Sequence, residues 1–283
     1  MEVSFWGVRG SIPSPGPATV RYGGNTSCVA VRLGSGALVV LDCGTGARNL
    51  GLSLLTGPFG QGQGRATFLL SHAHWDHIQG FPFFLPFYTA GNRFTVYGGA
   101  HTPALLEEVL ERQMAAQYFP VQTIKNMAAQ IEMRAVVPAQ PFTVDGATVR
   151  AHANPHGPTP AFAFRIEDGG RVLAYASDAG YGQDGPSGGA IAICQDADLL
   201  IHDSTFTPED RALRIARGLS SLEDAVECAV RARVKRLALF HYDQDYSDHQ
   251  VDQLVARGRR LLDERGGPDI QIVGAAEGLT LTL

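Results

Sequence analysis

The residues best suited to do chemistry lie in one short run, His72-Ala73-His74-Trp75-Asp76-His77. Three histidines and one aspartate within six positions supply the imidazole and carboxylate ligands that zinc and related divalent ions accept. With nine histidines in the chain, such a run is expected by chance on the order of once per thousand sequences. The run therefore predicts a divalent metal site. A solvated or hydrogen-bonded histidine cluster without a metal is the alternative.

A strand and a turn must position this run. The segment from Thr67 to Ser71 is apolar and predicts a strand, and His72 follows directly at its end. Residues that directly follow a strand place their side chains at the edge of the sheet and not in the core. Functional groups tend to lie at such edges. Ile78-Gln79-Gly80 then lets the chain turn into a helix.

Short apolar, β-branched segments recur on both sides of this run and predict two groups of strands, without a clear sequence repeat. The expected strands are Val3 to Trp6, Ser27 to Leu33, Leu38 to Leu41, Thr67 to Leu70, Ile131 to Val137, Thr148 to His152, Ala161 to Glu167, Arg171 to Ala176 and Leu237 to Phe240. Strands and helices intermix without a linker, which favours one domain over residues 1–283.

Helices are expected mainly late in the chain. Ser220 with Glu223, and Ser247 with Gln250, have the spacing of reciprocal caps at a helix start. Pro103 to Gln113 is a further helix candidate. It opens a stretch, residues 101–133, that we interpret as an insertion over the active site, with an ordinary surface helix and loop as the alternative.

Composition limits the class of protein. The chain has 283 residues, 45% of them hydrophobic, which is ample for a buried core. No apolar run approaches the roughly 18 residues of a membrane span, and no signal segment opens the chain, so we expect a cytoplasmic protein without a membrane partner. The four dispersed cysteines are expected to be reduced and packed. A net charge of −5 argues against binding of long nucleic acid.

The pattern H-x-H-x-D-H after a strand resembles the signature of the metallo-β-lactamase superfamily. Three earlier segments, Phe5 to Ser11, Gly23 to Cys28 and Asp42 to Gly46, resemble the opening of its phosphodiesterase-like branch, which is related to the tRNA 3′-end processing nucleases. The resemblance extends along nearly the whole chain. It implies an α/β fold of the four-layer αβ/βα sandwich type.

The resemblance also implies where the distant ligands lie. His156, in Asn154-Pro155-His156-Gly157, matches the third histidine of a first metal site, and His152 is its rival. Asp178 matches the carboxylate that bridges two metals, although an aspartate at a strand end is otherwise a turn residue. His241 follows a strand, as His72 does. The implied metal ligands are His72, His74, Asp76, His77, His156, Asp178 and His241.

The implied activity is hydrolysis of a phosphodiester with two divalent ions, which share a hydroxide as nucleophile. Zinc is the first expectation for the metal, with manganese or iron as alternatives. The expected partner is a small or cyclic nucleotide-like anionic phosphodiester, not a long nucleic acid, and a homodimer is compatible with the sequence. The alternatives are hydrolysis of a lactone, thioester or amide, or a metal-binding sensor or interaction module without turnover.

One position departs from the related nucleases. They carry a histidine in a segment resembling G-H-S, which is thought to assist the leaving group, whereas this chain has Gly218-Leu219-Ser220. His202 or His249 could donate the proton instead, and a hydrogen-bonded structural role for His202 is equally open. Asp76 is expected to take part in catalysis as well as in metal binding. Asp42 could orient a ligand histidine or be a plain turn residue.

Overall fold

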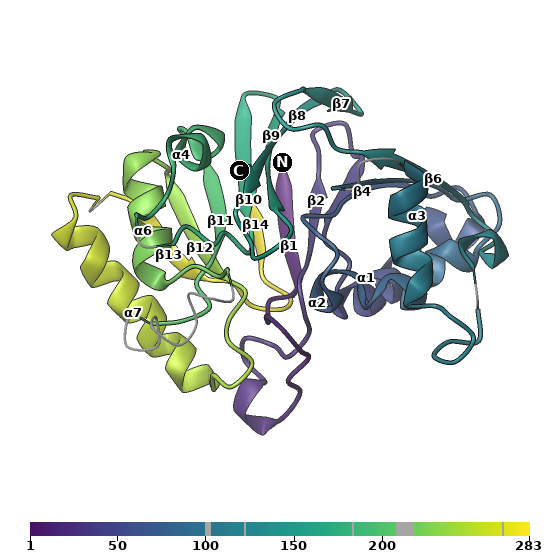
Figure 1. Cartoon of the computed structure of the whole chain (residues 1–283), viewed down its shortest axis with the longest axis horizontal. Helices are drawn as coiled ribbons and strands as arrows, with labels where there is room; N and C mark the ends of the chain where they lie inside the picture. The colour runs from purple at the N-terminus through teal and green to yellow at the C-terminus, as the bar shows by residue number, and fades with distance from the viewer. Residues whose placement is uncertain (100–102, 122, 183, 208–217, 268) are drawn as a thin grey trace.

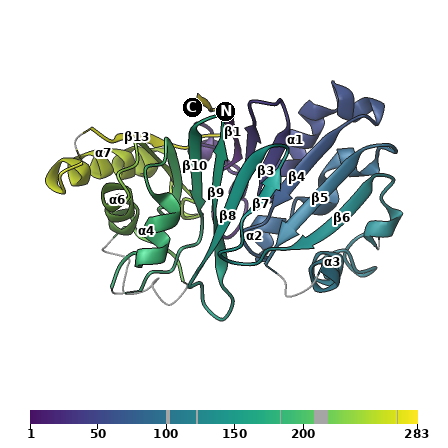
Figure 2. The same cartoon turned by 90° about the horizontal axis from the view of Figure 1, so that it is seen from above.

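The chain forms two seven-stranded sheets that lie face to face, with helices on the outer face of each (Figures 1 and 2). The structure is a computed structural model that describes residues 1–99, 103–121, 123–182, 184–207, 218–267 and 269–283. The layers run helix, sheet, sheet, helix. The predicted α/β four-layer sandwich is therefore confirmed.

The first sheet has the order β14-β1-β2-β3-β4-β5-β6. It is antiparallel from β14 to β3 and parallel from β3 to β6. Its strands are β1 (Glu2–Gly7), β2 (Cys28–Arg32), β3 (Leu38–Leu41), β4 (Arg65–Leu69), β5 (Arg93–Gly98), β6 (Gln130–Ala135) and β14 (Thr280–Thr282). The helices on its side are α1 (Gly46–Leu54), α2 (Trp75–Ile78) and α3 (Pro103–Arg112), with short 3-10 turns η2 (Pro58–Gln61), η3 (Phe81–Phe83), η4 (Leu85–Tyr88) and η5 (Ile124–Asn126).

The second sheet has the order β13-β12-β11-β10-β9-β8-β7 and is likewise half parallel and half antiparallel. Its strands are β7 (Phe142–Val144), β8 (Ala147–Asn154), β9 (Ala161–Asp168), β10 (Arg171–Ala176), β11 (Leu199–Asp203), β12 (Arg236–Phe240) and β13 (Gln271–Gly274). The helices α4 (Gly188–Cys194), α6 (Leu222–Arg231) and α7 (Asp248–Glu264) cover its outer face (Figures 1 and 2).

Alternation along β3 shows how the sequence builds two apolar layers from one strand. Val39 and Leu41 belong to the large core cluster that includes residues of both sheets. Leu38 and Val40 belong to the cluster on the other face, with the residues of α1 and the 3-10 turns. Successive side chains of a strand point to opposite faces, so an all-apolar strand is expected where both faces are covered.

Serines start the two C-terminal helices, as the sequence predicts, but one cap is shifted. Ser247 and Gln250 form the expected reciprocal cap of α7. For α6 the expected pair was wrong by one residue, because Ser221 and Asp224 form the cap. Ser220 does not cap α6, because its amide donates to Asp203 and its hydroxyl donates to the carbonyl of Ala179.

Within the predicted insertion, α3 and the described residues just after it pack on the outer face of the first sheet. Leu106, Leu110 and Met114 are buried in the same cluster as the 3-10 turns, and β6 is the edge strand of the sheet. Residues 101, 102 and 122 lie outside the described residues. An insertion that covers the active site stays a prediction.

Two expectations from composition can be compared with the structure. All four cysteines are buried and free, as expected. Within the described ranges, no helix has the length and apolar character needed to cross a bilayer.

Candidate metal centre

The predicted ligands come together at the ends of strands from both sheets. The run from His72 to His77 follows β4, Asp178 follows β10 and His241 follows β12. His156 lies just beyond β8. In sheets of this kind, the carboxyl ends of the strands are the usual place for a ligand site. The site therefore lies where the two sheets meet, and each sheet contributes side chains to it.

The side chains form two groups that could each hold a metal ion, and the donor atoms of each group all lie within 4.8 Å of one another. Among the described residues, the first group is His72, His74, His156 and Asp178, and the second is Asp76, His77, Asp178 and His241. These are the seven residues that the sequence and the resemblance indicated. The cluster is compatible with binding of divalent metal.

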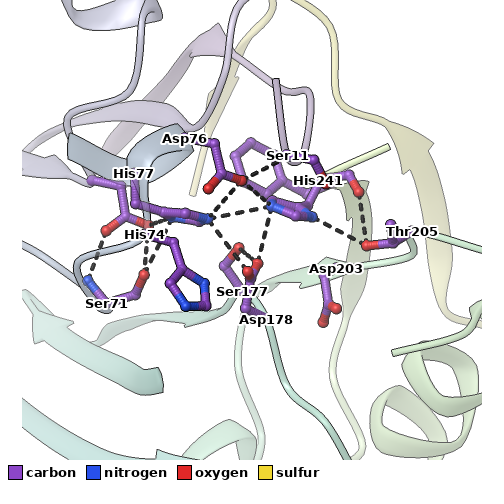
Figure 3. Close-up of polar contacts among 12 residues, drawn as sticks. Ser11, Ser71, His74, Asp76, His77, Ser177, Asp178, Asp203, Thr205 and His241 are labelled. Carbon is purple, nitrogen blue, oxygen red and sulfur yellow. Dashed lines mark hydrogen bonds and ion pairs between the residues drawn. The ribbon is translucent and has the colours of Figure 1, made fainter. Parts of the chain in front are cut away.

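Asp178 belongs to both groups. Figure 3 shows its carboxylate beside His77 and His241 of the second group. Its Oδ2 atom is 3.5 Å from Nε2 of His72 in the first group and 3.4 Å from Nε2 of His77 in the second. Its Oδ1 atom is 3.1 Å from Nε2 of His241. A carboxylate with one oxygen next to histidines of both groups, and the other oxygen next to the second group, is placed to be shared between two metal positions.

Hydrogen bonds from Nδ1 fix which nitrogen of four histidines is free to bind a cation. Each Nδ1 atom faces an oxygen that can accept its proton, so Nε2 keeps a lone pair directed into the cluster. The pairs are His72 with Ser71 Oγ at 3.0 Å, His77 with Asp42 Oδ2 at 2.7 Å, His156 with the Gly218 carbonyl at 2.6 Å and His241 with Thr205 Oγ1 at 3.1 Å. These tautomers are assigned from the acceptors.

The free nitrogens are arranged as they would be around a metal ion. Nε2 of His156 is 2.9 Å from Nδ1 of His74, and Nε2 of His77 is 3.3 Å from Nε2 of His241. A tetrahedral zinc shell with bonds of ~2.0–2.1 Å separates its donor atoms by about 3.3 Å. In addition, the buried Nε2 atom of His72 has no hydrogen-bond partner. Lone pairs that face one another fit a cation between them.

Burial and charge act on these groups in opposite directions. Burial lowers the pKa of His72 well below its usual value, which favours the neutral ligand form. Burial also disfavours charge on His77, but three neighbouring carboxylates outweigh it and raise its pKa well above the usual value. Burial opposes ionisation of Asp178, yet His241, His77 and His72 together lower its pKa. The buried carboxylates therefore create a field that attracts cations.

The N-terminal segment after β1 supports the second group. The amide of Ser11 donates to Oδ2 of Asp76 at 2.7 Å. Next to it, Gly10 lies against the ring of His241, where an added Cβ would be only 2.3 Å from the ring atom Cε1. The Gly10-Ser11 step is therefore close-packed against two candidate ligands, Asp76 and His241, a contact that the sequence did not reveal.

The remaining histidines named from the sequence lie outside both groups. His152 lies within β8 and packs over Gly189, and His249 is exposed on α7 beside Gln253. His202 is buried, with Nε2 2.9 Å from the hydroxyl of Tyr181 and Nδ1 2.8 Å from the carbonyl of Asp203.

Burial opposes charge on His202, but Asp203 and Cys228 together outweigh burial and raise the pKa of His202 to about 10. Its contacts fit the hydrogen-bonded structural role that the sequence left open. Catalysis by His202 stays a prediction that these contacts do not support.

The sequence left open whether Asp42 orients a candidate ligand histidine or is a plain turn residue. Its contacts fit the orienting role, because its carboxylate accepts a hydrogen bond from Nδ1 of His77. Sequence reasoning missed four other supporting groups: Ser71, Thr205, Tyr175 and the carbonyl of Gly218. Hydroxyls and carbonyls have no characteristic spacing, so only the fold identifies them.

Known proteins with a similar sequence or fold include nucleases. A ribonuclease Z of Natronomonas pharaonis is 27% identical over 292 residues, which cover 87% of this chain and 88% of the relative. Human tRNase Z, short form, has a TM-score of 0.68 at 20% identity, covering 100% of this chain and 99% of the other. A diphosphatase from the PhnP family has a TM-score of 0.68 at 19% identity, covering 100% and 97%. The two structures show the fold.

One prediction about partners is overturned by these relatives. From the net charge of −5, no binding of long nucleic acid is expected, yet relatives that match along nearly their full length are ribonucleases Z. That expectation is wrong. Net charge is a poor guide here, because metal ions in a site supply positive charge locally whatever the total charge of the chain.

The family to which the chain belongs is shown by a match along most of its length. The family model described as "Beta-lactamase superfamily domain" matches residues 38–242. This range begins with β3 and contains all seven residues of the two groups. The chain therefore belongs to the β-lactamase superfamily, and it is a metal-dependent hydrolase of the phosphodiesterase type.

Proposed function

We propose that this protein hydrolyses phosphodiesters with two divalent metal ions, one in each group, and that zinc is the first metal to test. The observation that carries the proposal is the convergence of seven donor residues, six of them buried, on two adjacent positions that share Asp178. Two bound ions would supply charge for phosphoryl oxygens and lower the pKa of water. Each metal position has three residues of its own, and the carboxylate of Asp178 is shared between the two positions. This arrangement leaves room for substrate oxygens to bind the ions.

The residues of the chain itself hold and orient these positions. Six of the seven residues are at most 6% exposed, whereas His74 is exposed and its neighbour Trp75 is 71% exposed. A substrate therefore approaches past His74 and Trp75. Asp76, whose Oδ2 accepts the amide of Ser11, is proposed to take part in catalysis as well as in metal binding.

We propose two candidate substrates, and both are phosphodiesters. A small or cyclic nucleotide is the first, and an RNA, as for the ribonuclease Z relatives, is the second. Hydrolysis of a lactone, thioester or amide would use the same centre, because two metals polarise carbonyl groups too. We further propose a single domain over residues 1–283.

Metal content and substrate range test this proposal together. We expect two ions per chain by elemental analysis after the protein is stripped with a chelator and reloaded with zinc, manganese or iron. The reloaded protein should hydrolyse bis(p-nitrophenyl) phosphate, and a 2′,3′-cyclic nucleotide or a 3′-extended tRNA should compete with it. No more than one ion after reloading would contradict the binuclear proposal. Turnover of a lactone but of no phosphodiester would support the alternative, and bound metal without any turnover would indicate a sensor.

Leu219 predicts a dependence on the leaving group. The residue is 7% exposed and follows Gly218, whose carbonyl orients His156. No described histidine outside the ligand groups contacts them, so the leaving group lacks an evident acid. We expect rates to fall steeply as leaving-group pKa rises, and Leu219→His to improve poor leaving groups by about 10-fold to 100-fold. Nitrophenolate esters should gain little.

The control for Leu219→His is Leu219→Met, which keeps an apolar side chain at the same place. A flat dependence on leaving-group pKa in the unmodified protein, with chemistry shown to limit the rate, would mean that another acid is present.

A further inference from the structure

The carboxylate of Asp42 is a hydrogen-bond centre between the two sheets. The residue is fully buried, follows β3 and has a φ of +56°. Oδ1 accepts the amide of Ser71 at 2.7 Å. Oδ2 accepts three donors: the Ser71 hydroxyl at 2.8 Å, Nδ1 of His77 at 2.7 Å and the Tyr175 hydroxyl at 2.6 Å. A buried carboxylate needs such donors, because burial without them is costly.

Asp42 reaches a ligand in each metal group. It accepts the Nδ1 proton of His77, a member of the second group, directly. It reaches His72, a member of the first group, through Ser71, because the hydroxyl that donates to Asp42 is 3.0 Å from Nδ1 of His72 and can accept its proton. One anion thus fixes the tautomer of one ligand histidine in each group.

Tyr175 donates to Asp42 from the other sheet. It lies in β10 of the second sheet and is fully buried, whereas Asp42 and Ser71 follow strands β3 and β4 of the first sheet. Burial, reinforced by the adjacent Asp42, raises the pKa of Tyr175 well above its usual value, so the hydroxyl stays protonated and donates. Without this donor, Oδ2 would lose the shortest of its three hydrogen bonds.

We propose that Tyr175 is a positioning residue for both metal sites, acting through Asp42 on His77 and through Asp42 and Ser71 on His72. The inference rests on the metal binding in the proposed function. If the hydroxyl is removed, Asp42 is less well held and both ligand histidines lose part of their orientation. Outer hydrogen-bond partners of metal ligands typically contribute 10-fold to 100-fold to metal affinity.

The test compares two tyrosine variants in the full chain. Tyr175→Phe is expected to weaken zinc binding at both sites by about 10-fold each, at the lower end of that range. Tyr242→Phe is the matched control, because Tyr242 is also fully buried but its hydroxyl donates to the carbonyls of Leu239 and Ala275. Both variants lose one buried hydroxyl, so both should lose similar stability to urea, and only the first should lose zinc affinity.

Zinc affinity is measured by competition with a chromophoric chelator, and the visible absorption of bound Co²⁺ reports changes in ligand geometry without turnover. Ser71→Ala separates the two routes, because it should weaken the site of His72 more than the site of His77. Equal zinc affinities in Tyr175→Phe and the unmodified protein would overturn the inference, and so would loss at one site only. If the unmodified protein fails to bind two ions, the proposed function fails instead.

Discussion

Replacing Asp178 by alanine is expected to release at least one of two bound ions and to lower phosphodiester hydrolysis by about 1,000-fold or more. The reason is the place of its two oxygens. One lies 3.4 Å from His77 and 3.5 Å from His72, and the other lies 3.1 Å from His241. Without this carboxylate, neither group keeps four donors, and the negative charge that attracts cations is reduced. Elemental analysis and initial rates on one preparation measure both effects.

Asp196→Ala is a control matched in backbone conformation. Asp178 and Asp196 both have a left-handed φ, 55° and 53°, so alanine introduces comparable backbone strain at either position. Asp196 is distant from the ligand groups and pairs with Arg233 on the surface. We expect this variant to keep two ions and its rate. Two ions in Asp178→Ala would contradict a bridging role.

His156→Ala is expected to abolish hydrolysis and to weaken metal retention in the first group. The side chain is buried, its Nε2 atom lies 2.9 Å from Nδ1 of His74, and the carbonyl of Gly218 holds its other nitrogen. Loss of a ligand from a site with three histidines leaves the ion with two nitrogens and Asp178. We expect a rate at least about 1,000-fold lower and one tightly bound ion in place of two.

The comparison variant is His152→Ala, which removes the rival histidine four residues earlier. His152 lies in β8, and burial lowers its pKa, but it belongs to neither group. We expect both metal content and rate to stay close to those of the unmodified protein. The opposite ranking of the two variants would mean that the ligand lies on the other side of Asn154-Pro155.

Local patterns in the sequence predicted one part of the site and the resemblance predicted another. His72, His74, Asp76 and His77 are close in sequence, so their spacing alone indicates a metal. His156, Asp178 and His241 each lie in a short strand-end loop that resembles many turns, so only the family pattern selected them. The supporting groups depend on tertiary contacts: the hydroxyl of Tyr175 reaches Asp42 over 133 positions of sequence.

The fold could be predicted in type but not in arrangement. The apolar strands β3 and β10 have the bounds that the sequence predicts. Five strands, β5, β7, β11, β13 and β14, were not among the expected ones. β7 and β14 have only three residues each, too few to show an alternating pattern. The order of strands in each sheet depends on pairing between distant segments, which local patterns do not encode.

Ligands from both sheets have a consequence for stability. An ion in either group would join the segment 72–77 of the first sheet to Asp178 of the second, and so act as a reversible cross-link between the two halves of the molecule. Cross-links between distant segments reduce the entropy of the denatured chain. By mass action, each site adds about 2.7 kcal/mol when free metal is 100 times its dissociation constant. If the proposed ions bind, the melting temperature of this protein would rise with the free metal concentration, and a cell that becomes poor in metal would lose folded protein together with activity.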